Sequence, residues 1–154
     1  GLTLSLDWKG IDFTVFGSGN IGNKIWFTAL RTSQIRNVPE VFYTQSWTKD
    51  RQNARFPSID HALDNYWVES DGMIYDGSYL RINQIQLGYT LPKKWLDKVK
   101  FGNTRIYASL DDFFTFTKYF GFDPAVAGDG NGKGLDRGSY PTARKIMFGL
   151  NLSF

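Results

Sequence analysis

The sequence of 154 residues contains no cysteine and only one histidine. The absence of cysteine excludes disulfide bonds, thiolate nucleophiles, iron–sulfur clusters and cysteine-ligated zinc. The sequence also lacks any run of about 18 uncharged apolar residues, so no transmembrane helix is predicted. A membrane-spanning β-strand needs only about 9–11 residues of alternating character, and this second absence therefore leaves a membrane β-barrel open.

Charge of either sign is sparse. The chain has 18 Lys and Arg against 15 Asp and Glu, a net charge of +3. The basic residues are scattered, and the densest pair is Lys93-Lys94. Nucleic-acid binding needs a basic stripe or patch, so no nucleic-acid partner is expected.

Apolar and polar residues alternate with period two in five segments, which is typical of β-strands with one apolar face. The segments are residues 2–8, 11 to about 27, 79–91, 104–116 and 145–154. Within the third segment the phase slips between Ile82 and Ile85, which predicts a β-bulge. The cleanest segment is the last, where Ile146, Phe148, Leu150, Leu152 and Phe154 alternate with Lys145, Met147, Gly149, Asn151 and Ser153.

The links between these segments are alternately short and long. Lys9-Gly10 and residues 92–103 form the short links, and the second could contain one or two helical turns. Residues 28–78 and 117–142 form long polar links. Antiparallel strands that cross a bilayer show this order, with short turns on the periplasmic side and long loops outside. The pattern predicts an all-β, antiparallel transmembrane β-barrel segment whose C-terminus is periplasmic.

Aromatic residues support the membrane interpretation because they gather near the ends of the predicted strands, where an interfacial girdle would hold them. They are Trp8, Tyr79, Tyr89, Trp95, Phe116 and Tyr119. The alternative from the pattern alone is a soluble antiparallel sandwich. The alternating strand pattern begins at the very start of the chain, at Gly1, and we therefore expect that the sequence begins within a larger protein.

Two glycine-rich motifs resemble ligand sites, but their contexts do not fit. Residues 17–22 match the dinucleotide pattern G-x-G-x-x-G, yet no helix or repeated βα unit is predicted after them. The glycines are better explained by a close approach between backbones. Residues 129–134 begin like a calcium loop, but Lys133 and Tyr140 occupy positions that need oxygen ligands. We therefore expect no cofactor and no metal.

No catalytic constellation is found. Asp111 and Asp112 are neighbours on a predicted strand, so their side chains should point to opposite faces. His61 lies in a polar loop near Asp60 and Asp64, without a suitable nucleophile. We expect that the protein is not an enzyme. Aromatic residues in the long links could stack on a ligand, or could pack the loops together; they are Trp47, Tyr66, Trp67, Tyr119 and Phe120.

Four blocks of the sequence, residues 79–95, 114–124, 138–144 and 148–154, resemble in their order the C-terminal part of SusC/RagA-type TonB-dependent outer-membrane transporters. Residues 8–13 and 22–25 are also similar to the hairpin that precedes this part. The resemblance implies that residues 1–154 are the last five or so strands of a large, plugged barrel of 22 strands in the bacterial outer membrane. The plug domain and the remaining strands would lie outside this sequence.

The resemblance further implies energised import of glycan or peptide fragments. The implied partners are a SusD-like surface lipoprotein, a TonB-type energy-coupling protein that acts through the N-terminal part, and the outer-membrane assembly machinery. The last strand would be the assembly signal, carried by Phe148, Leu150, Leu152 and Phe154. The alternatives are a complete small outer-membrane barrel and a soluble, aromatic-rich carbohydrate-binding β-sandwich.

Overall fold

The computed structural model describes all residues except 29–38, 59–68, 97–101, 126–131, 139 and 154. The chain forms two compact units, and each is described by itself. The sheet unit comprises residues 1–21, 78–117 and 141–154, and the loop unit comprises residues 22–77 and 118–140.

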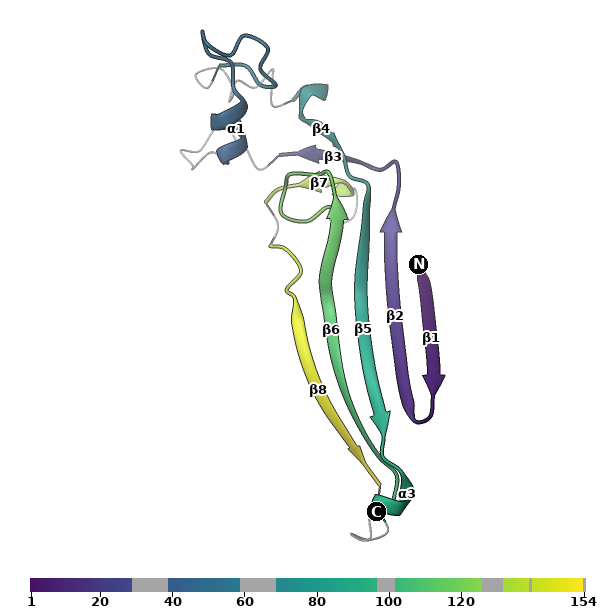
Figure 1. The fold of residues 1–154 in the computed structure, drawn as a ribbon. Helices are drawn as coiled ribbons and strands as arrows, with labels where there is room; N and C mark the ends of the chain where they lie inside the picture. Colours follow the sequence, from purple (N-terminus) through teal and green to yellow (C-terminus); the bar gives the residue numbers. More distant parts are fainter. Residues whose placement is uncertain (29–38, 59–68, 97–101, 126–131, 139, 154) are drawn as a thin grey trace. The chain divides into compact units, whose positions relative to one another are not determined.

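The sheet unit is a five-stranded antiparallel sheet in the order β1-β2-β5-β6-β8 (Figure 1). Its strands are β1 (Leu2–Trp8), β2 (Ile11–Asn20), β5 (Tyr79–Thr90), β6 (Thr104–Thr117) and β8 (Lys145–Leu152). Each of the five predicted segments contains one of them. The sheet is not closed in the described part of the chain, where β1 and β8 form its two edges.

The two short links have local explanations in the sequence. Lys9 and Gly10 both have positive φ angles, 48° and 86°, which is the conformation of the tightest hairpin turns. Proline cannot continue a strand ladder, and after Pro92 the chain forms the short helix α3 (Lys93–Leu96). The Trp95 amide donates to the Pro92 carbonyl over 3.0 Å. The predicted helical turn is confirmed.

The predicted β-bulge is also confirmed. The register between β5 and β6 shifts between Ile82 and Gln84, so Asn83 has no cross-strand partner there. On β6, Asp112 adopts a positive φ of 53°. The Asn83 side-chain amide donates to the Asp112 carboxylate over 3.2 Å and joins the two irregular positions.

The prediction that the second strand continues to about Phe27 is wrong. β2 ends at Asn20, and the chain turns at Gly22, whose φ is +84°. Residues Lys24–Phe27 form β3, which belongs to the loop unit. There β3 pairs antiparallel with β4 (Ile74–Asp76) and parallel with β7 (Leu135–Asp136).

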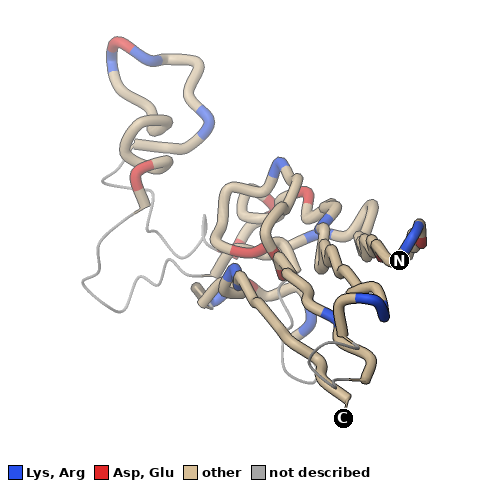
Figure 2. The backbone as a smooth tube through the Cα atoms, turned by 60° about the horizontal axis from the view of Figure 1, so that its bottom comes forward, with Lys and Arg blue, Asp and Glu red and all other residues tan. Residues whose placement is uncertain are grey.

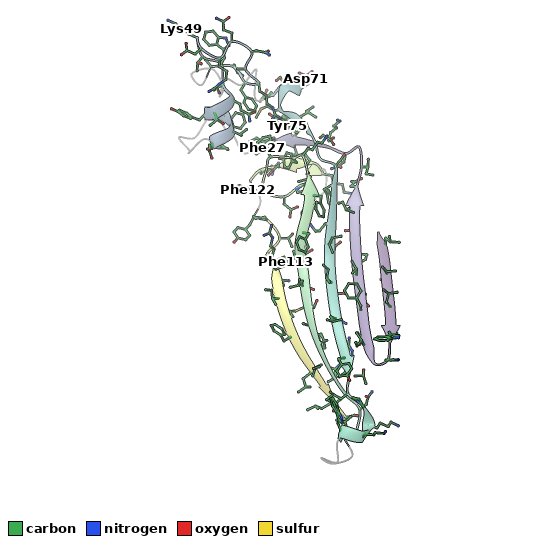
Figure 3. All side chains as sticks on the ribbon, in the orientation of Figure 1. Phe27, Lys49, Asp71, Tyr75, Phe113 and Phe122 are labelled. Atoms are coloured by element: carbon green, nitrogen blue, oxygen red, sulfur yellow. The ribbon has the colours of Figure 1, made fainter. Side chains whose placement is uncertain are left out.

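The loop unit has a hydrophobic core of its own, which the polar composition of the long links did not predict. It contains the helix α1 (Glu40–Gln45) and the 3-10 turn η1 (Asp71–Met73). Phe42 of α1 is fully buried, with its ring centroid 4.3 Å from that of Phe56. The other buried core residues are Ile25, Phe27, Met73, Tyr75 and Tyr119, of which Figure 3 labels Phe27 and Tyr75.

Candidate functional site

One face of the five-stranded sheet is apolar across its whole width. The register aligns side chains into rows that run from β1 to β8, and side chains stand off both faces of the strands (Figure 3). Three complete rows are Trp8–Ile11–Tyr89–Ile106–Leu150, Leu6–Phe13–Leu87–Ala108–Phe148 and Leu4–Val15–Ile85–Leu110–Ile146. None of these fifteen positions carries a charge.

This apolar face is exposed. Phe148 is 82% exposed and Leu150 is 57% exposed, although a soluble sheet would bury such side chains against a second layer. The central strands β2, β5 and β6 have 10, 12 and 14 residues, enough for the roughly 9–11 residues that span a bilayer. The face therefore has the chemistry and the length of a lipid-facing barrel surface.

The opposite face is polar, and an ion pair crosses its middle. Arg105 on β6 donates two hydrogen bonds to the Asp12 carboxylate on β2, one of them over 2.9 Å from Nε. The Arg105 guanidinium also lies 5.0 Å from the centre of the Tyr107 ring, within the range of a cation–π contact. The ion pair spans β5, which runs between β2 and β6.

Two glycines make room for this polar arrangement. A Cβ atom on Gly88 of β5 would meet the carboxylate of Asp12 and the guanidinium of Arg105. A Cβ atom on Gly149 of β8 would overlap the Tyr107 ring. Sequence analysis did not predict these contacts, although the alternation does place all five residues on the polar face.

A second polar group lies at the bulge. Ser18 donates to the Asn83 side-chain oxygen over 2.5 Å, and Asn83 donates to Asp112. Ser109 donates to the Asp111 carboxylate over 2.6 Å. Ser18 and Ser109 belong to the polar face, so both aspartates lie there too. The prediction of opposite faces is wrong because the positive φ of Asp112 interrupts the alternation.

The loop unit holds a buried carboxylate. Asp136 is 1% exposed, accepts a hydrogen bond from the Tyr119 hydroxyl over 2.6 Å and accepts another from the Gly138 amide over 2.8 Å. Burial, together with this hydrogen bond to Asp136, raises the pKa of the Tyr119 hydroxyl far above its usual range. Burial also raises the pKa of Tyr75.

The residues expected to face a ligand do not share one surface. Trp47 is 44% exposed, whereas Tyr119 is buried and Phe120 packs against the aromatic core. Tyr66 and Trp67 lie outside the described residues. Of the expected assembly signal, Phe148, Leu150 and Leu152 lie exposed on the apolar face of β8, and Phe154 lies outside the described residues.

The glycine motif at residues 17–22 acts structurally. A Cβ atom on Gly19 would lie 2.6 Å from the Tyr79 carbonyl oxygen, so the two backbones approach closely, as expected. Residues 129–131 of the calcium-like motif lie outside the described part, and residues 132–134 lie within it. His61, Asp60 and Asp64 also lie outside the described residues. Among the residues that the structure describes, no group of His, Cys, Asp and Glu could hold a metal ion. The described helices include none that is long and apolar enough to cross a membrane.

The sheet unit is an open antiparallel sheet with one apolar and one polar face, which is the architecture of a partial, unclosed β-barrel. No protein-family model matches the sequence. Along its whole length, however, the chain resembles SusC- and RagA-type TonB-dependent receptors. It is 31% identical over 162 residues to TonB-dependent receptor P3 of Formosa agariphila and 27% identical over 155 residues to TonB-dependent receptor SusC of Bacteroides thetaiotaomicron.

The fold leads to the same group of proteins. Structures of the RagAB peptide importer in its closed-closed state and of the RagAB peptide transporter match 99% of the chain, with TM-scores of 0.75 and 0.74 at 21% and 22% identity. The chain spans only about 16% of the length of the curated relatives and of these structures. These proteins are receptors and transporters rather than enzymes, and the resemblance stated from the sequence is confirmed.

Proposed function

We propose that the chain is a wall segment of a TonB-dependent transporter in the bacterial outer membrane. In this proposal residues 1–154 are the C-terminal portion of the barrel, and the plug domain and the other strands belong to a longer parent protein. The apolar face contacts lipid and the polar face lines the lumen. The observation that carries the proposal is the set of three uncharged rows that continue across all five strands.

Site-directed labelling tests this orientation directly. The sequence has no cysteine, so single cysteines can be introduced into it in a cysteine-free parent protein. We expect spin labels at Leu150→Cys to be accessible to oxygen dissolved in the bilayer and labels at Asn151→Cys to be accessible to a water-soluble relaxation agent. The same accessibility at both neighbours would contradict the proposed wall.

The direction of the sheet gives a proposed topology. The short links and the end of β8 share one end of the sheet, because Thr104 of β6 pairs with Leu152. Short turns are periplasmic in outer-membrane barrels, so the C-terminus would be periplasmic and both long segments would be outside the cell. A protease added to intact cells should then cleave within residues 40–58 and leave the 91–96 link intact.

The transported substrate and the partners are proposed from the relatives. RagAB is described as a peptide importer, and the parent of this chain would import peptide or glycan fragments. A SusD-like surface lipoprotein would bind outside, at the loop unit, and a TonB-type protein would supply energy through the missing N-terminal part. Co-purification of the parent protein with a surface lipoprotein from its own membrane tests the first partner; a parent protein that purifies alone after mild detergent extraction would contradict it.

The last strand is proposed as the recognition element for outer-membrane assembly. In the described residues β8 pairs with β6 only, so its other edge is open for β-augmentation, with Phe148, Leu150 and Leu152 setting the register. Deletion of Phe154 in the parent protein should then cause periplasmic accumulation and degradation. Normal insertion after the deletion would leave Phe154 with an anchoring role only.

A further inference from the structure

The apolar face is not flat. It contains a hollow of about 500 Å³ on the strands β5, β6 and β8. Its side-chain lining comes from Leu87, Tyr89, Ile106, Ala108, Phe148 and Leu150, and the intervening residues Gly88, Tyr107 and Gly149 complete it. β6 pairs directly with both β5 and β8, so the hollow is formed by neighbouring strands of this chain.

A single small residue explains the hollow. Ala108 lies between two large residues of its row, Leu87 as its partner on β5 and Phe148 as its partner on β8. Leu87 and Phe148 are 54% and 82% exposed, so these large side chains stand above the alanine on either side. The result is an apolar trough along β6 that extends from Ala108 to Ile106, in the direction of the short-link end of the sheet.

That end of the sheet is basic. The described short-link residues, 9–10 and 91–96, include Lys9, Lys93 and Lys94 and no acidic residue, although Asp7 and Asp12 lie in the adjoining ends of β1 and β2. Figure 2 colours the basic segments blue and the acidic segments red. Trp8 and Trp95 lie beside these lysines in the sequence and are more than half exposed. Exposed tryptophan and lysine are typical of the headgroup region of a membrane.

The spacing between the trough and the lysines fits one leaflet. From Leu87 to Lys93 the chain advances six residues, roughly 20 Å if extended, which is about 14 Å of membrane depth at a tilt of 45°. One leaflet contributes about 15 Å of hydrocarbon. The trough therefore lies at acyl-chain depth when the lysines lie among the headgroups.

We propose that this trough binds one acyl chain of an anionic phospholipid, whose phosphate group is held by Lys9, Lys93 and Lys94. The inference rests on the proposed function, because it needs the apolar face to be in contact with lipid. The charge at the short-link end selects the anionic headgroup, and the shape around Ala108 selects one position on an otherwise continuous lipid-facing surface.

The first experiment tests the acyl-chain site with a variant whose larger side chain fills the trough. The parent transporter is released from nanodiscs of mixed phosphatidylglycerol and phosphatidylethanolamine, and bound lipids are counted by native mass spectrometry. We expect phosphatidylglycerol retention to fall about tenfold in Ala108→Leu, because about two methylene contacts are lost. Val15→Phe is the matched control: it also enlarges a side chain on the apolar face, but outside the trough, and retention should be unchanged.

The second experiment tests the headgroup assignment with variants that remove the positive charge of lysine side chains. The double variant Lys93→Gln/Lys94→Gln should lose the preference for phosphatidylglycerol over phosphatidylethanolamine, while Lys49→Gln in the loop unit should keep it. Equal retention in Ala108→Leu and Val15→Phe would overturn the acyl-chain site, and an unchanged preference in the lysine variant would overturn the headgroup assignment. Heat-modified migration on gels confirms that each variant is folded. If the proposed wall itself were wrong, the cysteine labels at positions 150 and 151 would show it independently of either lipid result.

Discussion

The ring of Tyr107 on β6 lies over Gly149, its direct partner on β8, in the space that a side chain at position 149 would occupy. The same ring also makes a cation–π contact with the guanidinium of Arg105, two residues earlier on β6. An aromatic ring that covers a glycine on the adjacent strand shields backbone that would otherwise be uncovered. Tyr107 thus couples the packing of the edge strand β8 to the ion pair on the polar face.

Substitution of Gly149 tests this coupling. Gly149→Ala should destabilise the barrel by roughly 1–3 kcal/mol, because the new Cβ overlaps the Tyr107 ring and forces it to move. The double variant Gly149→Ala/Tyr107→Ala should be more stable than the sum of the single changes indicates. Urea unfolding of the parent protein in lipid vesicles measures both values; strictly additive losses would show that the ring and the glycine do not interact.

Charge on the last strand should be tolerated on one face only. Phe148→Arg should cost roughly 2–4 kcal/mol because position 148 lies in the row of Leu87, near the middle of the hydrocarbon region, and Met147→Arg should cost little because position 147 lies on the polar face. The two neighbours act as controls for each other. Reversible membrane-folding assays give the free energies, and equal losses at both positions would defeat the assignment of faces.

The ion pair between Asp12 and Arg105 should contribute a small coupling energy. Both side chains are about one quarter exposed, so water screens the pair, and we expect roughly 1 kcal/mol or less from a double-mutant cycle with Asp12→Asn and Arg105→Gln. The charge-swapped protein, Asp12→Arg with Arg105→Asp, should recover part of this coupling. A coupling energy of zero in the double-mutant cycle would contradict a stabilising interaction between Asp12 and Arg105.

The buried pair Tyr119–Asp136 should make the loop unit sensitive to alkaline pH. The pKa of Tyr119 is raised above its ordinary value of about 10, so its contribution to stability is complete below pH 10 and is lost as the pH rises further. Hydrogen exchange of β3 and β7 should therefore accelerate above about pH 10. In Tyr119→Phe this acceleration should weaken, and the loop unit should lose about 1–3 kcal/mol at neutral pH because Oδ2 of the buried Asp136 carboxylate loses the Tyr119 hydrogen bond, while the Gly138 amide still donates to Oδ1. Tyr43→Phe, an exposed tyrosine in the same unit, is the control.

The sheet could be predicted from the sequence because period-two alternation is a local signal. It located the strands, the bulge near Ile82 and the apolar face to within a few residues. It failed at the end of β2, where Ile21 is 92% exposed and Gly22 turns the chain although the apolar rhythm continues into β3. The strands with which a segment pairs depend on the tertiary structure, and alternation in the sequence does not show where that pairing changes.

The contacts of the candidate site needed the structure for the same reason. Asp12 and Arg105 are 93 residues apart, and only the register of β2, β5 and β6 shows that they meet over Gly88. One alternative from the sequence, the packing of loops by Tyr119 and Phe120, agrees with the core of the loop unit, but the sequence did not indicate Phe42 and Phe56, which are spaced widely through polar sequence. Isolated aromatic residues in a long link are the signal that could have predicted a second core.

The register of the sheet determines which face each side chain occupies, so a shift of one residue exchanges the two faces of a strand. A slip of the whole strand β8 by one residue against β6 would bring Lys145, Gly149 and Asn151 to the apolar face and turn Phe148 and Leu150 to the polar face. In the loop unit this parity is limited to its short strands, such as β3 with its alternately exposed and buried residues, and residues can be added or removed outside those strands without inverting any face. Changes of chain length are therefore expected in those segments of the loop unit, while the strands of the sheet unit can vary only by substitution.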